Sequence, residues 1–494
     1  MKRRRFVKTG LTLGAAALVR PGGAGGAGPS GPDGRADGRV DLVIRGGTVV
    51  DGTGAAAREA DVAISGGRIT AVGRVDAAGA DVIDARGLAV TPGFIDIHSH
   101  ADLALLVDPT APSRIHQGVT LEVVGQDGSS VGPWTPQAAR ETRERYRRDF
   151  GVDLDFDDLG GFFAAVDRVR PAVNVASMVG HGTLRAYVVG LDDRPASRAE
   201  LDRMRGLVSH AVEQGAVGLS SGLEYTPGSF APTDELVHLA GALSGTGYPY
   251  ASHMRNEDDR LLAAVEEALH VGRMAGVPVQ ISHLKAQGRR NWWKADAVLR
   301  AVEDAVADGL DVRFDRYPYV AYATGLSNLF PTWARARGTG AFMARLDDPS
   351  ARARMEEAVR AKVALLGSWD AVQISSAPPG EFAWLQGRRL GEAAREAGVE
   401  PFELTVRVMR AARGQVGMIG FGMSEENTAR ILAHPLGMLC SDGGAYAPEG
   451  PLHRGRPHPR AYGSFPRFFA RYVRERGDLS LEDAVHKVTG APAG

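Results

Sequence analysis

Two histidines separated by one residue follow an apolar run early in the chain. Residues 91–100 read Thr-Pro-Gly-Phe-Ile-Asp-Ile-His-Ser-His, so the pair is His98 and His100. Side chains at i and i+2 leave a strand on the same face, and both imidazoles can therefore point at one place. Neutral imidazole is a common ligand of divalent metals. The pattern predicts part of a metal site, against the alternative of two histidines on a surface loop.

Further residues that can bind metal or move protons follow other apolar runs. The chain has 13 histidines, and five of them fall at such positions. The complete set is His98, His100, Asp127, His181, His253, His283 and Asp442. Any one of these histidines alone is more often a hydrogen-bonded core or loop residue. Together, imidazoles and carboxylates at one end of a sheet predict a site for zinc or a similar metal, as one ion or a pair.

The runs that precede these residues predict the fold. Apolar runs recur from Gly93 onward, with helical periodicity between them at residues 198–214, 261–275 and 295–308. The runs are Phe94–His98, Val119–Gly125, Val173–Val179, Ala216–Ser220, Tyr250–His253, Val277–His283, Val312–Asp315 and Gly437–Asp442. This alternation predicts an α/β fold, a (β/α)8 barrel over residues 92–494, with a doubly wound open sheet as the competitor. We favour the barrel because its active sites draw residues from the carboxyl ends of many strands.

Two other segments depart from the barrel pattern. Residues 39–91 have short alternating runs and predict a small antiparallel β-unit, the N-terminal part of a β-sandwich. Within it, Val40–Gly52 predicts a strand, a turn and a strand, and Asp61–Ile69 predicts a hairpin. Between the seventh and eighth barrel strands, residues at about 325–425 exceed a normal connection. We expect them to form an insertion over the barrel mouth that acts as a lid or specificity element.

The N-terminus predicts export. Arg3-Arg4-Arg5-Phe6-Val7-Lys8 and the short apolar run after it resemble a twin-arginine signal, and residues 1–38 are predicted to be this signal and a flexible linker. The protein is therefore expected in the periplasm or outside the cell, without stable membrane insertion, because the apolar run is too short to span a bilayer. A net charge of −1 gives no electrostatic case for nucleic acid. The only cysteine, Cys440, excludes an internal disulfide and is predicted to be a buried core thiol.

The motifs together resemble one family. Thr-Pro-Gly-Phe-Ile-Asp-x-His-x-His after a small β-unit resembles the signature of the amidohydrolase superfamily. Within it the chain is similar to the N-acyl-D-amino-acid deacylases, or D-aminoacylases, over residues 39–494. The stretches that carry this resemblance are Gly180–Arg185, Gly215–Tyr225, Ser282–Lys285, Asp315–Tyr319, Ser441–Gly443 and His458–Arg467.

The resemblance implies roles for particular residues. His98, His100, His253 and His283 match the family's metal ligands, with zinc as the expected metal. Asp442 matches the aspartate that also acts as general base and acid. Lys285 and Tyr317 match residues that hold the substrate carboxylate, and Arg460 is predicted to contact the substrate with them. From its place after an apolar run, His181 is predicted either to support a metal ligand without touching the metal or to orient the substrate carbonyl.

The chain departs from the family in three places, one of which is Ala323, where the family often has a carboxylate-binding serine and Thr324 is the nearest replacement. The family has a metal-bridging cysteine after strand two, where this chain has Gly125-Gln126-Asp127-Gly128. A carboxylate can bridge two ions as well, so Asp127 predicts either a harder bridged site or one tightly held metal. The chain stops at Gly494, and we expect the C-terminal strands that complete the β-sandwich in relatives to be missing here.

These observations predict a metal-dependent hydrolase that cleaves N-acyl-D-amino acids, a small-molecule substrate class. A divalent metal supplies a hydroxide nucleophile at neutral pH, and Asp442 can take a proton and return it to the leaving amine. One rival is a cyclic amide hydrolase of the dihydroorotase or hydantoinase type. Another is a non-catalytic barrel that serves as a binding module. The sequence gives no indication of an oligomeric state.

Overall fold

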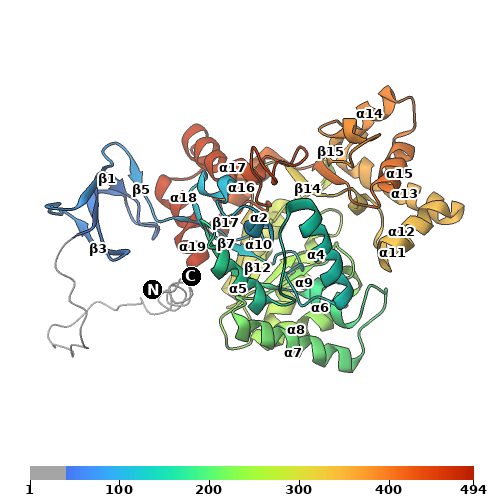
Figure 1. Cartoon of the computed structure of the whole chain (residues 1–494), viewed down its shortest axis with the longest axis horizontal. Coiled ribbons are helices and arrows are strands. Elements are labelled where there is room, and N and C mark those ends of the chain that lie inside the picture. The colour runs from blue at the N-terminus through green and yellow to red at the C-terminus, as the bar shows by residue number, and fades with distance from the viewer. Residues whose placement is uncertain (1–39) are drawn as a thin grey trace. The chain divides into compact units, whose positions relative to one another are not determined.

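The computed structural model describes residues 40–494, which divide into two compact units. The first holds residues 40–95 together with Leu479–Gly494, and the second runs from Asp96 to Asp478 (Figure 1). The predicted signal and linker lie outside the described residues. Among the described residues, no helix is both long enough and apolar enough to cross a bilayer.

The first unit is a five-stranded sheet with two short helices. Its elements are β1 (Leu42–Val49), β2 (Arg58–Ser65), β3 (Arg68–Gly73), β4 (Asp81–Asp84), β5 (Ala89–Val90), α18 (Leu481–Val488) and α19 (Gly490–Ala493). The strand order is β3-β2-β1-β4, with β5 also paired to β1. The predicted hairpin is confirmed: β2 and β3 pair antiparallel around Gly66 and Gly67, both with positive φ, as a tight hairpin turn requires.

Two details of this unit were predicted wrongly. No turn divides Val40–Gly52, because β1 runs on through Gly46 and Gly47 with a register shift between Ile44 and Gly47. Gly46 has φ 66°, and its amide donates to Asp61 Oδ1 at 2.8 Å, so the glycine forms a bulge instead of a turn. The sheet is also not purely antiparallel, since β4 and β5 both pair parallel to β1.

The second unit contains the predicted barrel. Its parallel strands are β6 (Phe94–Asp96), β7 (Val119–Val124), β8 (Asn174–Ser177) with β9 (Val179–Gly180), β10 (Leu219–Gly222), β11 (Tyr250–His253), β12 (Val279–Ile281), β13 (Val312–Arg316) and β17 (Gly437–Leu439). One sheet has the order β17-β13-β12-β11-β10-β9 and the other the order β6-β7-β8. A parallel bridge between Ser99, after β6, and Gly443, after β17, joins the two sheets. We count β8 and β9, which are separated by one residue, as the third strand of the barrel. The (β/α)8 prediction is confirmed, and the open sheet is excluded.

Helices surround this barrel. They are α2 (Ala104–Val107), α3 (Pro112–Ile115), α4 (Pro136–Phe150), α5 (Leu159–Val169), α6 (His181–Val188), α7 (Arg198–Gln214), α8 (Thr233–Ala240), α9 (Leu261–Ala275), α10 (Lys294–Ala307), α16 (Glu425–Ala433), α17 (Arg460–Arg467) and a π-helix, Phe468–Glu475. Helix α7 shows how the sequence sets such bounds. Ser197 and Glu200 form a capping box at its start, and Gly215 adopts the left-handed conformation that ends it.

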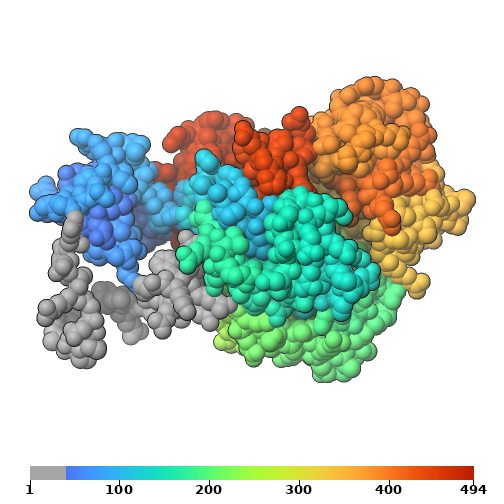
Figure 2. All heavy atoms as spheres, in the orientation of Figure 1, coloured from blue at the N-terminus to red at the C-terminus, as the bar shows by residue number. Residues whose placement is uncertain are grey.

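The long connection between β13 and β17 forms helices and a separate sheet within the second unit. It contains β14 (Ala321–Gly325), α11 (Thr332–Arg335), α12 (Gly338–Asp347), α13 (Pro349–Leu366), β15 (Val372–Ser376), α14 (Leu390–Glu396), α15 (Pro401–Ala411) and β16 (Gly417–Phe421). The strands form an antiparallel sheet of order β14-β16-β15. Buried Phe330, Met355, Phe402 and Met418 belong to one apolar cluster that packs the helices on this sheet. Figure 2 shows the segment, coloured yellow to orange, as a continuous mass. Cys440 is buried in the same apolar cluster, as predicted.

Candidate metal centre and active site

The carboxyl ends of the barrel strands bring the predicted metal ligands together. They are His98 and His100 after β6, Asp127 after β7, His253 at the end of β11, His283 after β12 and Asp442 after β17. His98, His253, His283 and Asp442 are buried, whereas Asp127 and His100 are partly buried, with side chains 9% and 33% exposed. Because residues far apart in sequence meet here, the barrel topology itself assembles the site.

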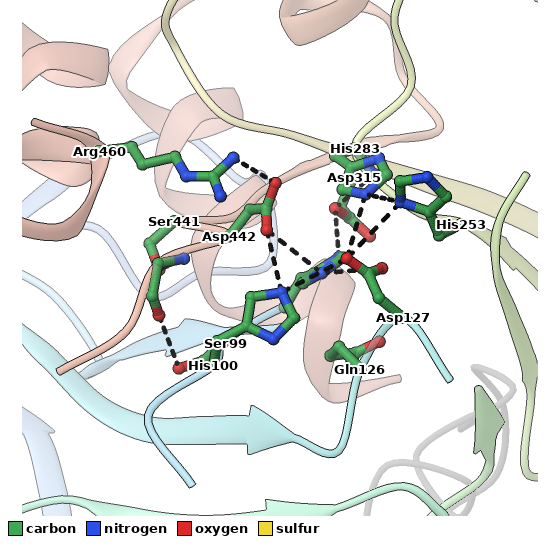
Figure 3. Close-up of polar contacts among 12 residues, drawn as sticks. Ser99, His100, Gln126, Asp127, His253, His283, Asp315, Ser441, Asp442 and Arg460 are labelled. Carbon is green, nitrogen blue, oxygen red and sulfur yellow. Dashed lines mark hydrogen bonds and ion pairs between the residues drawn. The ribbon is translucent and has the colours of Figure 1, made fainter. Parts of the chain in front are cut away.

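Asp127 lies at the centre of the cluster (Figure 3). Its Oδ1 is 3.3 Å from His98 Nε2. Its Oδ2 is 3.4 Å from His100 Nε2, 3.4 Å from His283 Nε2 and 3.6 Å from His253 Nδ1. One carboxylate therefore faces one nitrogen of each of four imidazoles, which is the arrangement expected of a bridging ligand.

Asp442 is a second carboxylate that faces His98 and His100. Its Oδ1 is 3.1 Å from His100 Nε2 and 3.6 Å from His98 Nε2. Its Oδ2 accepts a hydrogen bond from Arg460 Nη1 at 2.5 Å. The arginine thus fixes one carboxylate oxygen and turns the other toward the histidines, as Figure 3 shows.

The backbone is strained where it delivers these side chains. Asp127, His283 and Asp442 have φ values of 54°, 35° and 48°. Positive φ is uncommon for residues other than glycine and clusters at functional sites. Beside Asp127, a Cβ on Gly222 would come within 2.0 Å of the Asp127 carbonyl oxygen. The end of β10 must therefore be glycine so that the Asp127 turn can pack against it.

The cluster has the properties of a metal site. One ligand atom from each of His98, Asp127, His283 and Asp442 lies within 4.8 Å of the others. His98 Nε2 and Asp127 Oδ1 are buried and have no hydrogen-bond partner of good geometry among the described residues. Buried polar atoms without a partner are costly, and a shared cation would satisfy both.

The carboxylates and imidazoles of the cluster shift one another's pKa values toward the charged forms. Burial lowers the pKa of His100, but Asp127 and Asp442 outweigh burial and raise this pKa to about 9. Burial also lowers the pKa of His253, but the carboxylates Glu257 and Asp127 outweigh burial and raise this pKa to about 10. Burial raises the pKa of Asp127, but His98 and His283 hold it well below its usual range. Metal ligation requires neutral imidazoles, so a metal ion bound here would displace protons from His100 and His253.

A cavity of 570 Å³ opens beside the cluster. Lys285, Tyr317 and Arg460, the predicted substrate contacts, all line it. Lys285 Nζ lies 5.8 Å and Arg460 Cζ 4.9 Å from the centre of the Tyr317 ring, so the three groups are neighbours. The buried hydroxyl of Tyr317 has no hydrogen-bond partner among the described residues. The insertion contributes Tyr322, Ala323, Thr324, Asn328 and Lys362 to the same cavity.

His181 is placed elsewhere. It begins α6 and is not among the residues that line the described cavity. Its Nε2 lies 2.9 Å from Glu235 Oε1, and the other oxygen of Glu235 accepts from Arg185 at 2.5 Å. The ring therefore belongs to a buried ion-pair network in the wall behind the cavity.

Three charged residues of the site were not predicted from the sequence. Glu224, Glu257 and Lys362 all line the cavity. Glu257 lies four residues after His253, in the charged run Arg255–Arg260, which is typical of a solvated loop. Its spacing from a predicted ligand was the only available signal. Lys362 comes from α13 of the insertion, where no pattern pointed to the cavity.

Comparisons with known proteins agree with this geometry. Residues 81–494 match the amidohydrolase family. The chain is 36% identical to a D-aminoacylase of Alcaligenes xylosoxydans xylosoxydans, over 92% of this chain and 83% of that protein. It is 37% identical to an N-acyl-D-glutamate deacylase of the same organism, with the same shares covered.

A solved structure is similar over the same extent. The N-acyl-D-glutamate deacylase of Bordetella bronchiseptica, complexed with zinc and a phosphonate that mimics the tetrahedral intermediate, superposes with a TM-score of 0.76 at 34% identity. The match covers 92% of this chain and 85% of that one.

Proposed function

The chain belongs to the amidohydrolase family, and from this we propose that it is a zinc-dependent hydrolase of N-acyl-D-amino acids. The products are a carboxylic acid and a free D-amino acid. The observation that carries the proposal is the cluster around Asp127, set beside a cavity that also presents Lys285 and Arg460. Relatives that act on N-acyl-D-amino acids, similar over more than four fifths of their length, support the substrate class.

The histidines and Asp127 hold the metal in this proposal. Asp127 would be the ligand shared by two ions, with His98 and His100 as the further ligands of one and His253 and His283 as those of the other. When bound, zinc supplies a hydroxide nucleophile at neutral pH and polarises the amide carbonyl. A carboxylate bridge is harder than a thiolate and lowers the preference for zinc over other divalent ions.

Asp442 moves the proton. Arg460 holds its Oδ2, which leaves Oδ1 facing the histidines to accept a proton from the nucleophile. Burial opposes the ionised form of Asp442, but Arg460 outweighs it and keeps the pKa below its usual value. After carbonyl attack, the same oxygen lies where it can return the proton to the leaving amine.

Lys285 and Tyr317 bind the substrate carboxylate in this proposal. Lys285 supplies a buried cation, and Tyr317 supplies a hydroxyl that has no hydrogen-bond partner in the part of the chain that the structure describes. A charge-assisted hydrogen bond with a second donor beside it selects a carboxylate at a fixed position. Residues of the insertion line the remaining wall, so we assign acyl-group and side-chain preference to that segment.

The alternatives lack comparable support. The end of β10 is Ser220-Ser221-Gly222, so no lysine stands there to serve as the carboxylated metal bridge of other superfamily members. A binding module has no need of a carboxylate facing four imidazoles. We therefore retain the deacylase as the single proposal.

Amine release from paired substrates tests the function. N-acetyl-D- and N-acetyl-L-methionine, leucine, phenylalanine and glutamate are assayed with zinc and after chelation. Zinc-dependent turnover of the D series alone is expected. Bound zinc without turnover of either series would contradict the substrate class, and absence of both would contradict the enzyme.

We also propose that the twin-arginine motif directs export. The motif is Arg3-Arg4-Arg5-Phe6-Val7-Lys8. Replacing Arg3, Arg4 and Arg5 with lysine should retain a tagged chain in the cytoplasm, whereas the unchanged chain should reach the periplasm. Equal fractionation of both chains would contradict the assignment.

A further inference from the structure

Glu257 is a buried carboxylate that touches both halves of the site. It is 2% exposed. Its Oε1 lies 2.5 Å from Lys285 Nζ and 3.1 Å from His283 Nδ1. Its Oε2 accepts a hydrogen bond from Gln287 Nε2 at 2.6 Å. One side chain therefore connects a proposed metal ligand to the proposed anchor of the substrate carboxylate.

The two ring nitrogens of His283 face different groups, so the position of its hydrogen affects the contact with Lys285. Its Nε2 faces Asp127 at 3.4 Å, on the metal side. Its Nδ1 faces two groups, Glu257 Oε1 and Lys285 Nζ, the latter at 2.7 Å. An ammonium group can only donate, and a carboxylate can only accept. Nδ1 can therefore accept from Lys285 or donate to Glu257, but its single hydrogen position cannot serve both.

A metal ion bound at Nε2 would favour the state in which Nδ1 donates to Glu257 over the state in which Nδ1 accepts from Lys285. A neutral imidazole that ligates through one nitrogen carries its hydrogen on the other, where it donates to a neighbouring acceptor. With Nε2 occupied, His283 Nδ1 donates to Glu257, and Lys285 loses its acceptor at Nδ1. One N–H of Lys285 is then free to face the cavity, while Glu257 still compensates the charge of the lysine.

We propose that Glu257 is a positioning residue that couples metal binding at His283 to capture of the substrate carboxylate by Lys285. The proposal rests on the function proposed above. Glu257 holds His283 in the tautomer that ligates metal and holds Lys285 in place as a cation. Glu257 faces Nδ1 of His283, whereas Asp127 faces Nε2, so we assign Glu257 a positioning role at the ion that Nε2 would bind and not that of a ligand to it.

The test compares Glu257→Gln and Glu257→Asp with a matched control. Glutamine keeps the shape and loses the charge, and aspartate keeps the charge on a shorter side chain. Asp258→Asn is the control, because Asp258 is also buried, at 6% exposure, and its carboxylate pairs with Lys362 at 2.7 Å. No described contact joins the Asp258 side chain to His283 or Lys285.

The first measurement is zinc affinity without substrate, by competition with a chelator. Loss of the group that orients a metal-bound histidine typically weakens metal binding by about 10- to 100-fold. Glu257→Gln should fall in this range, Glu257→Asp should recover part of the loss, and Asp258→Asn should stay within about twofold of the unmodified protein. Unchanged zinc affinity in Glu257→Gln overturns the proposal.

The second measurement is kinetic, at saturating zinc, with the best N-acetyl-D-amino acid. Glu257→Gln should raise KM about tenfold or more with a smaller effect on kcat, because the substrate anchor is displaced while the reacting groups stay. In a Lys285→Met background the same change should raise KM by less than about twofold. Equal effects of Glu257→Gln in both backgrounds contradict a role through Lys285. Absence of all turnover by the unmodified protein would overturn the function proposed above, and zinc affinity would still decide the role of Glu257 at His283.

Discussion

Asp127 is the residue whose loss should damage the metal site most. Its two oxygens lie between 3.3 and 3.6 Å from four imidazole nitrogens, and its side chain is 9% exposed. Asp127→Asn keeps the shape and removes the charge. Removing one partner from a buried set of charges costs about 3 to 5 kcal/mol. Since every 1.4 kcal/mol is a factor of ten, the variant should bind zinc at least about 100-fold more weakly.

Asp127→Cys is the informative companion to this change. A thiolate is also an anionic zinc ligand that can occupy a bridging position. This variant should therefore retain zinc and most of the activity, with a sharper preference for zinc over manganese or cobalt because the ligand is softer. Asp258→Asn, which removes a buried carboxylate outside the cluster, serves as the control for nonspecific loss of stability.

Zinc content by mass spectrometry, affinity by chelator competition, and amine release are the three readouts. The reasoning is refuted if Asp127→Asn binds zinc as tightly as the unmodified protein. It is also refuted if Asp127→Cys and Asp127→Asn lose zinc to the same extent, since the charge would then not be the property that matters.

Four further predictions follow from the described contacts. Chelation should lower the melting temperature, and zinc at about 100 times its Kd should restore about 2.7 kcal/mol of stability, read by calorimetry. Lys285→Met should raise KM about 30- to 140-fold with little change in kcat, since a hydrogen bond to a charged group contributes about 2 to 3 kcal/mol; a larger effect on kcat than on KM would contradict its anchoring role. Gly222→Ala should release zinc by pushing Asp127 aside, because the added Cβ would lie 2.0 Å from the Asp127 carbonyl oxygen, whereas Gly206→Ala on α7, with no atom within 4 Å, should keep zinc bound. Burial and Arg460 lower the pKa of His458 to about 3 in the folded protein, whereas the usual value is 6.5. The folded protein is therefore fully stable with respect to this group above pH 6.5 and loses stability as the pH falls and the unfolded chain binds a proton. Compared with His458→Asn, the unmodified protein should lose about 2 kcal/mol of unfolding free energy between pH 7 and pH 5 in denaturant titrations.

The barrel and its ligand cluster were predictable because two independent patterns coincide. Apolar runs gave the strands, and polar residues at the ends of those runs gave the site. His253 ends β11 and Asp442 follows β17, so the run and the ligand were read from the same few residues. Parallel strands then force residues that are distant in sequence to meet, which is a property of the topology and needs no side-chain detail.

The failures have local physical causes. Gly46 and Gly47 looked like a turn, but glycine with positive φ also forms a bulge, and pairing with both β2 and β4 keeps the strand continuous. His181 was expected at the cavity because it follows the third strand. The chain enters α6 at that residue, and the ring lies 2.9 Å from the buried Glu235 and is not among the residues that line the described cavity.

The insertion marks a different limit of sequence reasoning. Its length was predicted, but its antiparallel sheet and the residues it sends to the cavity were not. Lys362 is an example. It lies on α13 among residues with an ordinary helical pattern, but its side chain is partly buried and its Nζ lies 2.7 Å from Asp258 Oδ2. Its partner belongs to another segment more than 100 residues away, and only the fold brings the two together.

The two sources of the site imply a division of labour. Side chains that face the metal cluster come from barrel strands and the turns directly after them, where backbone strain at Asp127, His283 and Asp442 is held by the surrounding sheet. Tyr322, Asn328 and Lys362 come from the insertion and form a wall that touches none of the four imidazoles facing Asp127 in the described contacts. Changes in the insertion can therefore alter substrate preference without disturbing the metal. Lys362→Met should accordingly leave zinc affinity within about twofold of the unmodified protein while changing relative kcat/KM among acyl groups and side chains. A parallel loss of zinc would show that insertion and metal centre are one unit.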